Sequence, residues 1–243
     1  MHGSSMDGLL LIDKPAGMSS HDVVAVVRRS LGGIRTGHAG TLDPFATGLL
    51  LVLIGRATKT QSAMMSLPKR YETVAQLGAL SSTGDTEGEI TWTRKLPPEQ
   101  PELPTGELRQ RPPVYSAVKI DGERAYKRAR RGESFEMPER IVTVTRFEQL
   151  WRDPDCPAEL LDGSPPTHPS TQLPRAGFAI DCGSGTYVRS LIAGLGDAYC
   201  LELRRTAIGP FEVDDAVPPP ARGEPWRDPP VIALDQALGT LSK

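Results

Sequence analysis

The sequence has few of the residues that mark disulfide-bonded, metal-binding or membrane-spanning proteins. Its 243 residues include only three cysteines, Cys156, Cys182 and Cys200, without the C-x-x-C spacing of a zinc site. Free thiols fit a reducing compartment, so we expect a cytoplasmic protein. The longest apolar run, residues 49–54, is far shorter than the roughly 20 residues of a membrane helix, so no membrane association is expected. No secretory signal is visible, and residues 1–7 are expected to be a leader or remnant outside the fold.

The sequence also has little net charge, but its charges are unevenly distributed. The formal net charge is −2, which argues against a protein that coats nucleic acid uniformly. Residues 109–131, however, hold eight Lys and Arg side chains against two acids. This stretch predicts either a strongly basic surface or an ordinary solvated helix, and charge alone does not separate the two.

The apolar patterning predicts an α+β domain around one mixed, largely antiparallel sheet flanked by helices and loops, because strands and helices do not alternate strictly. Strands are expected over residues 8–14, 47–55, 69–79, 140–151 and 176–182. Helices are expected over residues 20–31, with Ser20 as the cap, 57–67, a basic stretch ending at Gly132, and 186–199. The proline-rich stretches 96–113 and 153–174 are expected to lack regular structure, and the second reads as an exposed insertion.

The stretch "GHAGTLDPFATGLLLVLIG" places its most polar residues directly before its most apolar run. Asp43 precedes Pro44, and proline restricts its neighbour to extended conformations, so the carboxylate is held stiffly. A stiff carboxylate on a loop above a buried strand suits catalysis. The structural alternative is a turn aspartate bonded to nearby backbone, and composition alone favours that alternative.

Local patterns leave other candidate residues open. They favour structural roles for His38, as a loop histidine, and for Tyr71, as a strand-edge aromatic. Arg189 is expected in the first turn of a helix, where the helix dipole disfavours a cation. This misfit suggests a carboxylate or phosphate partner, and the alternative is a solvated arginine. The "GSG" at residues 183–185 indicates phosphate binding only weakly, and no pattern indicates a metal or cofactor.

Segments in a fixed order resemble one family, the TruB-type tRNA pseudouridine synthases of bacteria. They are "LLLIDKPAGMSSHDVV", "GHAGTLDPFATGLLLVLIGRATK", "KRYETVAQLGALSSTGDTEGEI", "RPPVYSAVKIDGERAYKRARRGE", "IDCGSGTYVRSLIAGLGD" and "LRRTAIGPF". The likeness covers residues 8–217. It implies the pseudouridine-synthase fold and an isomerase that converts uridine 55 in the tRNA T-loop into pseudouridine without a cofactor or metal.

The resemblance also implies roles for matching residues. Asp43 falls on the catalytic aspartate, and Arg189 on the arginine that pairs with the aspartate. Tyr71 falls on the tyrosine that stacks on the flipped base and is the candidate for catalytic proton transfer at C5. Tyr187 and Leu203 fall on residues that line the uridine pocket, and His38 on the histidine that holds the tRNA loop open. Phosphate contacts are expected from the basic stretch, with these candidates: Lys119, Arg124, Lys127, Arg128, Arg130 and Arg131.

The resemblance predicts a catalytic domain over residues 8–217 and a proline-rich tail over 218–243 with a short helix near 234–241. The family's small C-terminal RNA-binding domain, called PUA, is expected to be absent. The expected partner is the T-stem-loop of tRNA, and the expected state is a monomer. An RNA-binding or tRNA-folding protein is an alternative or accompanying function. A glycosidase-like hydrolase is a third possibility, but it needs two facing carboxylates and the sequence offers one strong candidate.

Overall fold

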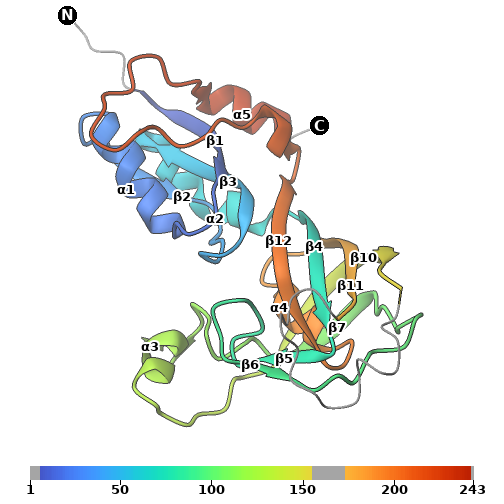
Figure 1. Ribbon diagram of the computed structural model, residues 1–243. Helices are drawn as coiled ribbons and strands as arrows, with labels where there is room; N and C mark the ends of the chain where they lie inside the picture. The colour runs from blue at the N-terminus through green and yellow to red at the C-terminus, as the bar shows by residue number, and fades with distance from the viewer. Residues whose placement is uncertain (1–5, 155–172, 242–243) are drawn as a thin grey trace, which may run out of the picture. The chain divides into compact units, whose positions relative to one another are not determined.

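The computed structural model describes residues 6–154 and 173–241. These residues divide into two compact units, one made of the chain up to residue 71 and from residue 204, the other of residues 72–203. The chain enters the second unit along β4 (Lys69–Leu77) and returns along β12 (Ala198–Ile208) (Figure 1). The second unit is therefore an insertion within the first.

The first unit surrounds the apolar strands near the N-terminus. Besides the ends of β4 and β12, its elements are β1 (Gly8–Lys14), α1 (Ser20–Ser30), β2 (Thr36–His38), β3 (Thr47–Ile54), the 3₁₀-helix η1 (Gly55–Thr60), α2 (Gln61–Ser66), β13 (Phe211–Glu212), η4 (Val213–Asp215), β14 (Ile232–Ala233) and α5 (Leu234–Leu241). β1 pairs antiparallel with β3 and with β14, and β3 pairs in parallel with β12.

Both faces of β1 and β3 are covered, as the unbroken apolar run of β3 predicts. Leu10 and Leu50 on one face pack against α1, whereas their neighbours Leu11 and Leu51 on the other face belong to a cluster with Met64 of α2. Ala237 of α5 joins the same cluster as Met64. Figure 1 shows α1 and α5 beside β1. The sheet is thus the middle layer of this unit.

The first turn of α1 differs from the expectation in one informative way. Its cap is Ser19 and not Ser20, because Ser19 and Asp22 form a reciprocal capping box. The hydrogen bonds from Ser19 lower the pKa of Asp22. Ser20 is therefore not used as a cap, and its buried hydroxyl instead contacts the loop before β3.

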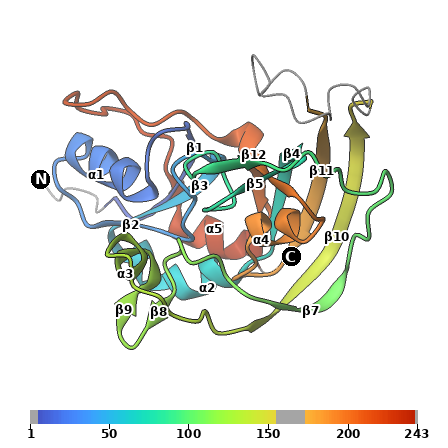
Figure 2. The ribbon, with the colours of Figure 1, turned by 60° about the horizontal axis from the view of Figure 1, so that its bottom comes forward.

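The second unit contains most of β4 and β12, the strands that it shares with the first unit. Besides the shared strands, its elements are β5 (Ala79–Ser81), β6 (Ile90–Trp92), β7 (Gly106–Gln110), β8 (Lys119–Ile120), β9 (Glu123–Arg124), α3 (Ala125–Arg130), β10 (Arg140–Arg152), β11 (Arg175–Cys182) and α4 (Val188–Ala193). The strand order is β12-β4-β11-β10-β7, and β10 pairs antiparallel with both β11 and β7 (Figure 2). β5–β6 and β8–β9 form separate two-stranded sheets.

The structure confirms the α+β class and the mixed, mostly antiparallel sheet. It also corrects several details. The helix expected over 186–199 ends at Ala193, and β12 begins at Ala198. β7 lies within the proline-rich stretch that was expected to lack structure. The stretch expected as a helix over 57–67 begins as the 3₁₀-helix η1 and continues as α2. Most of the expected insertion at 153–174 lies outside the described residues.

Candidate active site

Asp43 lies in the loop between β2 and β3, directly before the sheet. Its backbone carbonyl accepts a 3.2 Å hydrogen bond from the Ala46 amide, which closes a short turn. Gly48, at the start of β3, has a φ of +101°. A Cβ there would lie 2.3 Å from the Arg205 carbonyl oxygen, so only glycine allows β12 to approach this closely. The turn and the close strand pairing fix where the loop leaves the sheet.

Buried polar side chains from separate parts of the first unit hold the Asp43 loop by its backbone. The Ser20 hydroxyl donates to the Leu42 carbonyl at 3.1 Å and accepts from the Leu42 amide at 2.8 Å. The Lys14 ammonium donates to the Pro44 carbonyl at 3.2 Å. Both residues that flank Asp43 are therefore tied to other elements, and the carboxylate sits on a rigid support.

Arg205 of β12 completes this support. Its guanidinium donates to the carbonyls of Leu49 at 2.8 Å, Gly40 at 3.3 Å and Thr41 at 3.4 Å. Arg205 is 1% exposed, and Lys14 is completely buried. Buried cations behind a loop favour negative charge near it, because the low-dielectric interior screens them weakly. Arg205 thus ties the backbone of the loop to β12.

Tyr71 and His38 lie in the same unit as Asp43. Tyr71 is the third residue of β4, and its side chain is buried, whereas a strand-edge aromatic would be exposed. The start of β4 is anchored because the buried Lys69 ammonium donates to the Met65 and Leu67 carbonyls. His38 ends β2, and its ring meets the ring of His21 edge to face, with centroids 5.2 Å apart.

Arg189 of the second unit forms a buried ion pair with Asp85. Its Nη1 lies 3.1 Å from Asp85 Oδ2, and the two side chains are 3% and 4% exposed. Its guanidinium also donates to the carbonyls of Thr83 at 2.7 Å and Tyr115 at 3.0 Å. The carboxylate partner inferred from the helix dipole is therefore confirmed, and the solvated alternative is wrong.

Sequence reasoning missed Asp85. The signal was present, because Asp85 lies in the "SSTGDTEGE" segment within a stretch that resembles the family. The Thr83 hydroxyl donates to Asp85 Oδ1 at 2.5 Å, and the Glu87 amide donates to the same oxygen at 3.0 Å. These bonds orient the carboxylate toward Arg189 before any ligand binds.

Tyr187 and Leu203 also belong to the second unit. Tyr187 is the residue before α4 and packs against the buried cluster of Val118, Ala125 and Met137. Leu203 is buried on β12. His38, Asp43 and Tyr71 thus belong to the first unit, and Tyr187, Arg189 and Leu203 to the second.

The six basic candidates fall into two groups. Arg128 pairs with Asp121 and Glu133, at 3.2 and 2.9 Å, and Arg131 pairs with Glu123 and Glu133, both at 2.7 Å. Within residues 6–154 and 173–241, the other members make no salt bridge with a carboxylate: they are Lys119, Arg124, Lys127 and Arg130. The Arg130 guanidinium lies 5.6 Å from the Tyr126 ring centroid. Only the second group is available for phosphates without displacing a carboxylate.

The described residues contain no group of three or more His, Cys, Asp or Glu side chains placed to hold a metal ion. None of the helices in the described parts of the chain is long and apolar enough to cross a membrane.

Comparison with known proteins identifies the family. Residues 28–188 match the model of the TruB family pseudouridylate synthase N-terminal domain. The chain is 41% identical over 245 residues to tRNA pseudouridine synthase B of Corynebacterium aurimucosum, covering 95% of this chain and 76% of that protein. It is 42% identical over 224 residues to the enzyme of the same name from Corynebacterium glutamicum, covering 87% and 70%. The chain belongs to the TruB family of pseudouridylate synthases and is an isomerase.

Solved structures agree on the fold. A Cbf5–Nop10–Gar1 complex matches with a TM-score of 0.58 and 28% identity, over 87% of this chain and 52% of the matched chain. An H/ACA RNP bound to a substrate RNA containing 2′-deoxyuridine matches with a TM-score of 0.54 and 26% identity, over 86% and 49%. This chain spans about half the length of those solved chains. The expected pseudouridine-synthase fold is confirmed.

Proposed function

We propose that this protein converts uridine 55 in the T-loop of tRNA into pseudouridine, with Asp43 as the catalytic carboxylate. The observation that carries the proposal is the Asp43 loop, whose flanking residues Leu42 and Pro44 are fixed by Ser20 and Lys14. The chain is similar to enzymes named tRNA pseudouridine synthase B. Its Asp43 loop is also fixed in the way that a catalytic aspartate requires.

The reaction moves atoms only within the substrate. The bond between N1 of uracil and C1′ of ribose breaks, the base turns, and a bond forms between C5 and C1′. The proton lost from C5 is balanced by the proton gained at N1, so no oxidant, reductant or co-substrate is consumed. A positioned carboxylate is the kind of group that such a step needs, as a nucleophile or a base.

In this proposal, the remaining site residues bind the flipped uridine and the tRNA loop around it. The uridine must leave its stack before its ring can be reached. Tyr71 stacks on the flipped base and Tyr187 and Leu203 line its pocket, while His38 contacts the opened tRNA loop. Arg189, held by Asp85 within its own unit, pairs with Asp43 in the complete site.

The basic residues around α3 supply the electrostatic part of binding. Lys119, Arg124, Lys127 and Arg130 meet phosphates of the T-stem-loop, since a salt bridge with a carboxylate does not occupy them within the described chain. Arg128 and Arg131 contribute less, because Glu123 and Glu133 already occupy their guanidinium groups.

The test is the Asp43→Asn substitution, assayed with a T-stem-loop RNA under single-turnover conditions. We expect no detectable pseudouridine, with RNA affinity within about threefold of wild type because phosphate contacts dominate affinity. Asp214→Asn is the matched control, since Asp214 is an exposed carboxylate of the same unit, and it should leave the rate unchanged. Wild-type rates with Asp43→Asn would overturn the assignment, and free uracil as the product would indicate hydrolysis. A tRNA-folding activity that is independent of catalysis would survive in Asp43→Asn.

A further inference from the structure

Gln110 binds the backbone of Tyr187 at two points. It is the last residue of β7, and it is only 7% exposed. Its side-chain nitrogen donates to the Tyr187 carbonyl at 3.0 Å, and its side-chain oxygen accepts from the Tyr187 amide at 2.8 Å. The side-chain amide thus pairs with Tyr187 as a neighbouring strand would, and it fixes both the position and the orientation of that peptide.

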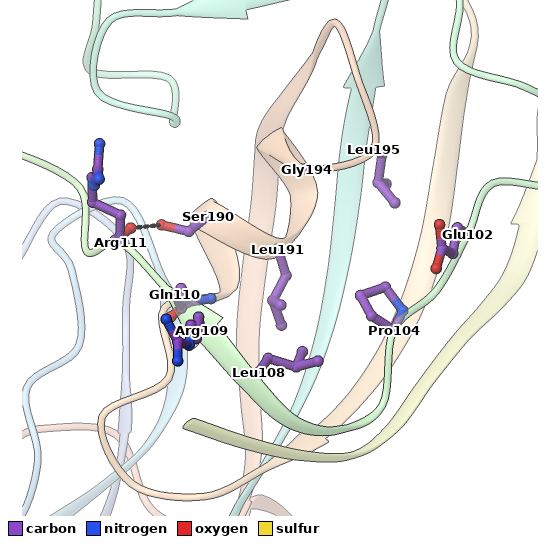
Figure 3. Close-up of a pocket in the computed structure, with 10 residues that line it drawn as sticks. All are labelled: Glu102, Pro104, Leu108, Arg109, Gln110, Arg111, Ser190, Leu191, Gly194 and Leu195. Atoms are coloured by element: carbon purple, nitrogen blue, oxygen red, sulfur yellow. Dashed lines mark hydrogen bonds between the residues drawn. The ribbon is translucent and has the colours of Figure 1, made fainter. Parts of the chain in front are cut away.

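The residues that follow Gln110 continue this contact along the first turn of α4. The Ser190 hydroxyl donates to the Arg111 carbonyl at 3.1 Å, as Figure 3 shows. The Arg189 guanidinium donates to the Tyr115 carbonyl at 3.0 Å. The segment from Gln110 to Tyr115 is therefore bonded to Tyr187, Arg189 and Ser190 in succession.

The turn depends on this support because α4 has little stability of its own. The helix has six residues, and helices of that length do not persist alone in water. The Tyr187 side chain does not cap the first turn of α4. An open pocket of about 400 Å³, partly lined by Leu108, Leu191 and Leu195, lies beside the helix (Figure 3). Apolar packing is therefore incomplete on the pocket side of α4, so hydrogen bonds contribute more to fixing the position of the turn.

We propose that Gln110 is a positioning residue of the isomerase: its paired hydrogen bonds set Tyr187 and, through the same turn, Arg189 in the geometry that the flipped uridine requires. The inference rests on the proposed function. Gln110 does not itself touch the base in this scheme. It acts because small misplacements of groups around a reacting centre lower the rate steeply, by up to about a hundredfold for 1 Å.

The experiment compares Gln110→Met with Gln76→Met. Methionine keeps the length of the side chain and removes both hydrogen bonds. Gln76 is the matched control, since it is 1% exposed in the same unit, and its amide donates to the carbonyls of Leu77, Leu173 and Pro174. Both variants lose a buried amide, but only Gln110→Met changes the Tyr187 turn. Gln110→Asn is a second variant that keeps the amide and shortens its reach.

Two readouts separate positioning from general destabilisation. For Gln110→Met and Gln110→Asn we expect kcat on the T-stem-loop RNA to fall about tenfold to a hundredfold while KM stays within about twofold. The Tyr187 amide should exchange its hydrogen about tenfold faster or more, because its hydrogen bond is lost. Gln76→Met should leave kcat and the Tyr187 exchange rate near wild type.

The outcomes that overturn the inference differ from those that overturn the proposed function. If wild type makes pseudouridine and both Gln110 variants keep the wild-type kcat, or lose no more than Gln76→Met does, Gln110 is not a positioning residue. An unchanged exchange rate at Tyr187 in the Gln110 variants would also contradict it. If the folded wild-type protein makes no pseudouridine, the proposed function is overturned instead. The exchange measurement then still tests whether Gln110 fixes the Tyr187 backbone.

Discussion

Arg189 and Asp85 form an ion pair at 3.1 Å in which both side chains are almost completely buried. The Thr83 hydroxyl and the Glu87 amide bind the carboxylate, while the Thr83 and Tyr115 carbonyls bind the guanidinium. Such a pair adds little net stability over an apolar core, but removing one partner leaves a buried charge uncompensated. The Asp85 carboxylate therefore allows the charged Arg189 guanidinium to be buried at this position.

Asp85→Asn should lower the free energy of unfolding by up to about 3–5 kcal/mol, because it removes one charge from a buried, hydrogen-bonded ion pair. Urea unfolding of the whole protein measures this change. Asp121→Asn is the control, since it removes one carboxylate from the surface pair with Arg128. We expect no measurable loss in the control. Equal stability of wild type and Asp85→Asn would show that the pair does not anchor Arg189.

Ser20→Ala should weaken the Asp43 loop. Leu42 loses both its donor and its acceptor, and its buried amide is left without that partner, at a cost of about 1–3 kcal/mol. The pseudouridine assay should show a lower kcat, since Asp43 follows Leu42 directly. Ser30→Ala is the control, because the Ser30 hydroxyl only donates to the Val27 carbonyl at the end of α1. A fully active Ser20→Ala variant would contradict the role of this tether.

Lys127→Ala should reduce the salt dependence of RNA binding more than Arg131→Ala does. Removing a phosphate contact lowers the slope of log affinity against log salt by about 0.7–1. Arg131 is already held by Glu123 and Glu133, so its loss should change the slope less. Fluorescence anisotropy with a labelled T-stem-loop between low and moderate salt measures both slopes. The division into two groups is wrong if Arg131→Ala has the larger effect.

The carboxylates around α3 predict a local response to acid. Hydrogen bonds from Arg131 and then Arg128 lower the pKa of Glu133, and Arg131 likewise lowers the pKa of Glu123. A folded pKa below the unfolded value means that the stabilisation is complete above about 4.5 and is lost as the pH falls through the lowered value. The protection of amides in β9 and α3, relative to the intrinsic exchange rate at each pH, should therefore fall below about pH 4. Glu133→Gln should show lower protection there already at neutral pH, and equal protection in both proteins would contradict the network.

The sequence was sufficient where one physical signal dominated. The apolar run of β3 and the alternation of β10 predicted both strands, and the Asp-Pro step predicted a rigid loop. β12 was missed because its sequence "AYCLELRRTAI" carries charges that a central strand normally lacks. The structure shows why they are tolerated: Arg205 donates to the Gly40 and Thr41 carbonyls of the Asp43 loop, and Arg204 pairs with Asp13 at 2.9 Å.

The functional residues likewise differ in whether a local sequence signal could identify them. The dipole argument identified Arg189 as a residue in need of a partner, but no local rule could choose Asp85 over other acids, because that contact joins residues about a hundred positions apart. Gln110 was missed for a similar reason, since its role depends on Tyr187 lying against the end of β7. Contacts between distant segments are what the sequence pattern does not encode.

The insertion of one unit into the other has a consequence for how the protein is made. A ribosome releases the chain from its N-terminus, so β1 and β3 emerge long before β12, the strand that lies parallel to β3. All of residues 72–203 are synthesised in between. The second unit can therefore fold while the first still lacks a sheet neighbour and the Arg205 side chain. The Asp43 loop therefore reaches its final geometry only after β12 has been synthesised, when all of residues 72–203 have already been made.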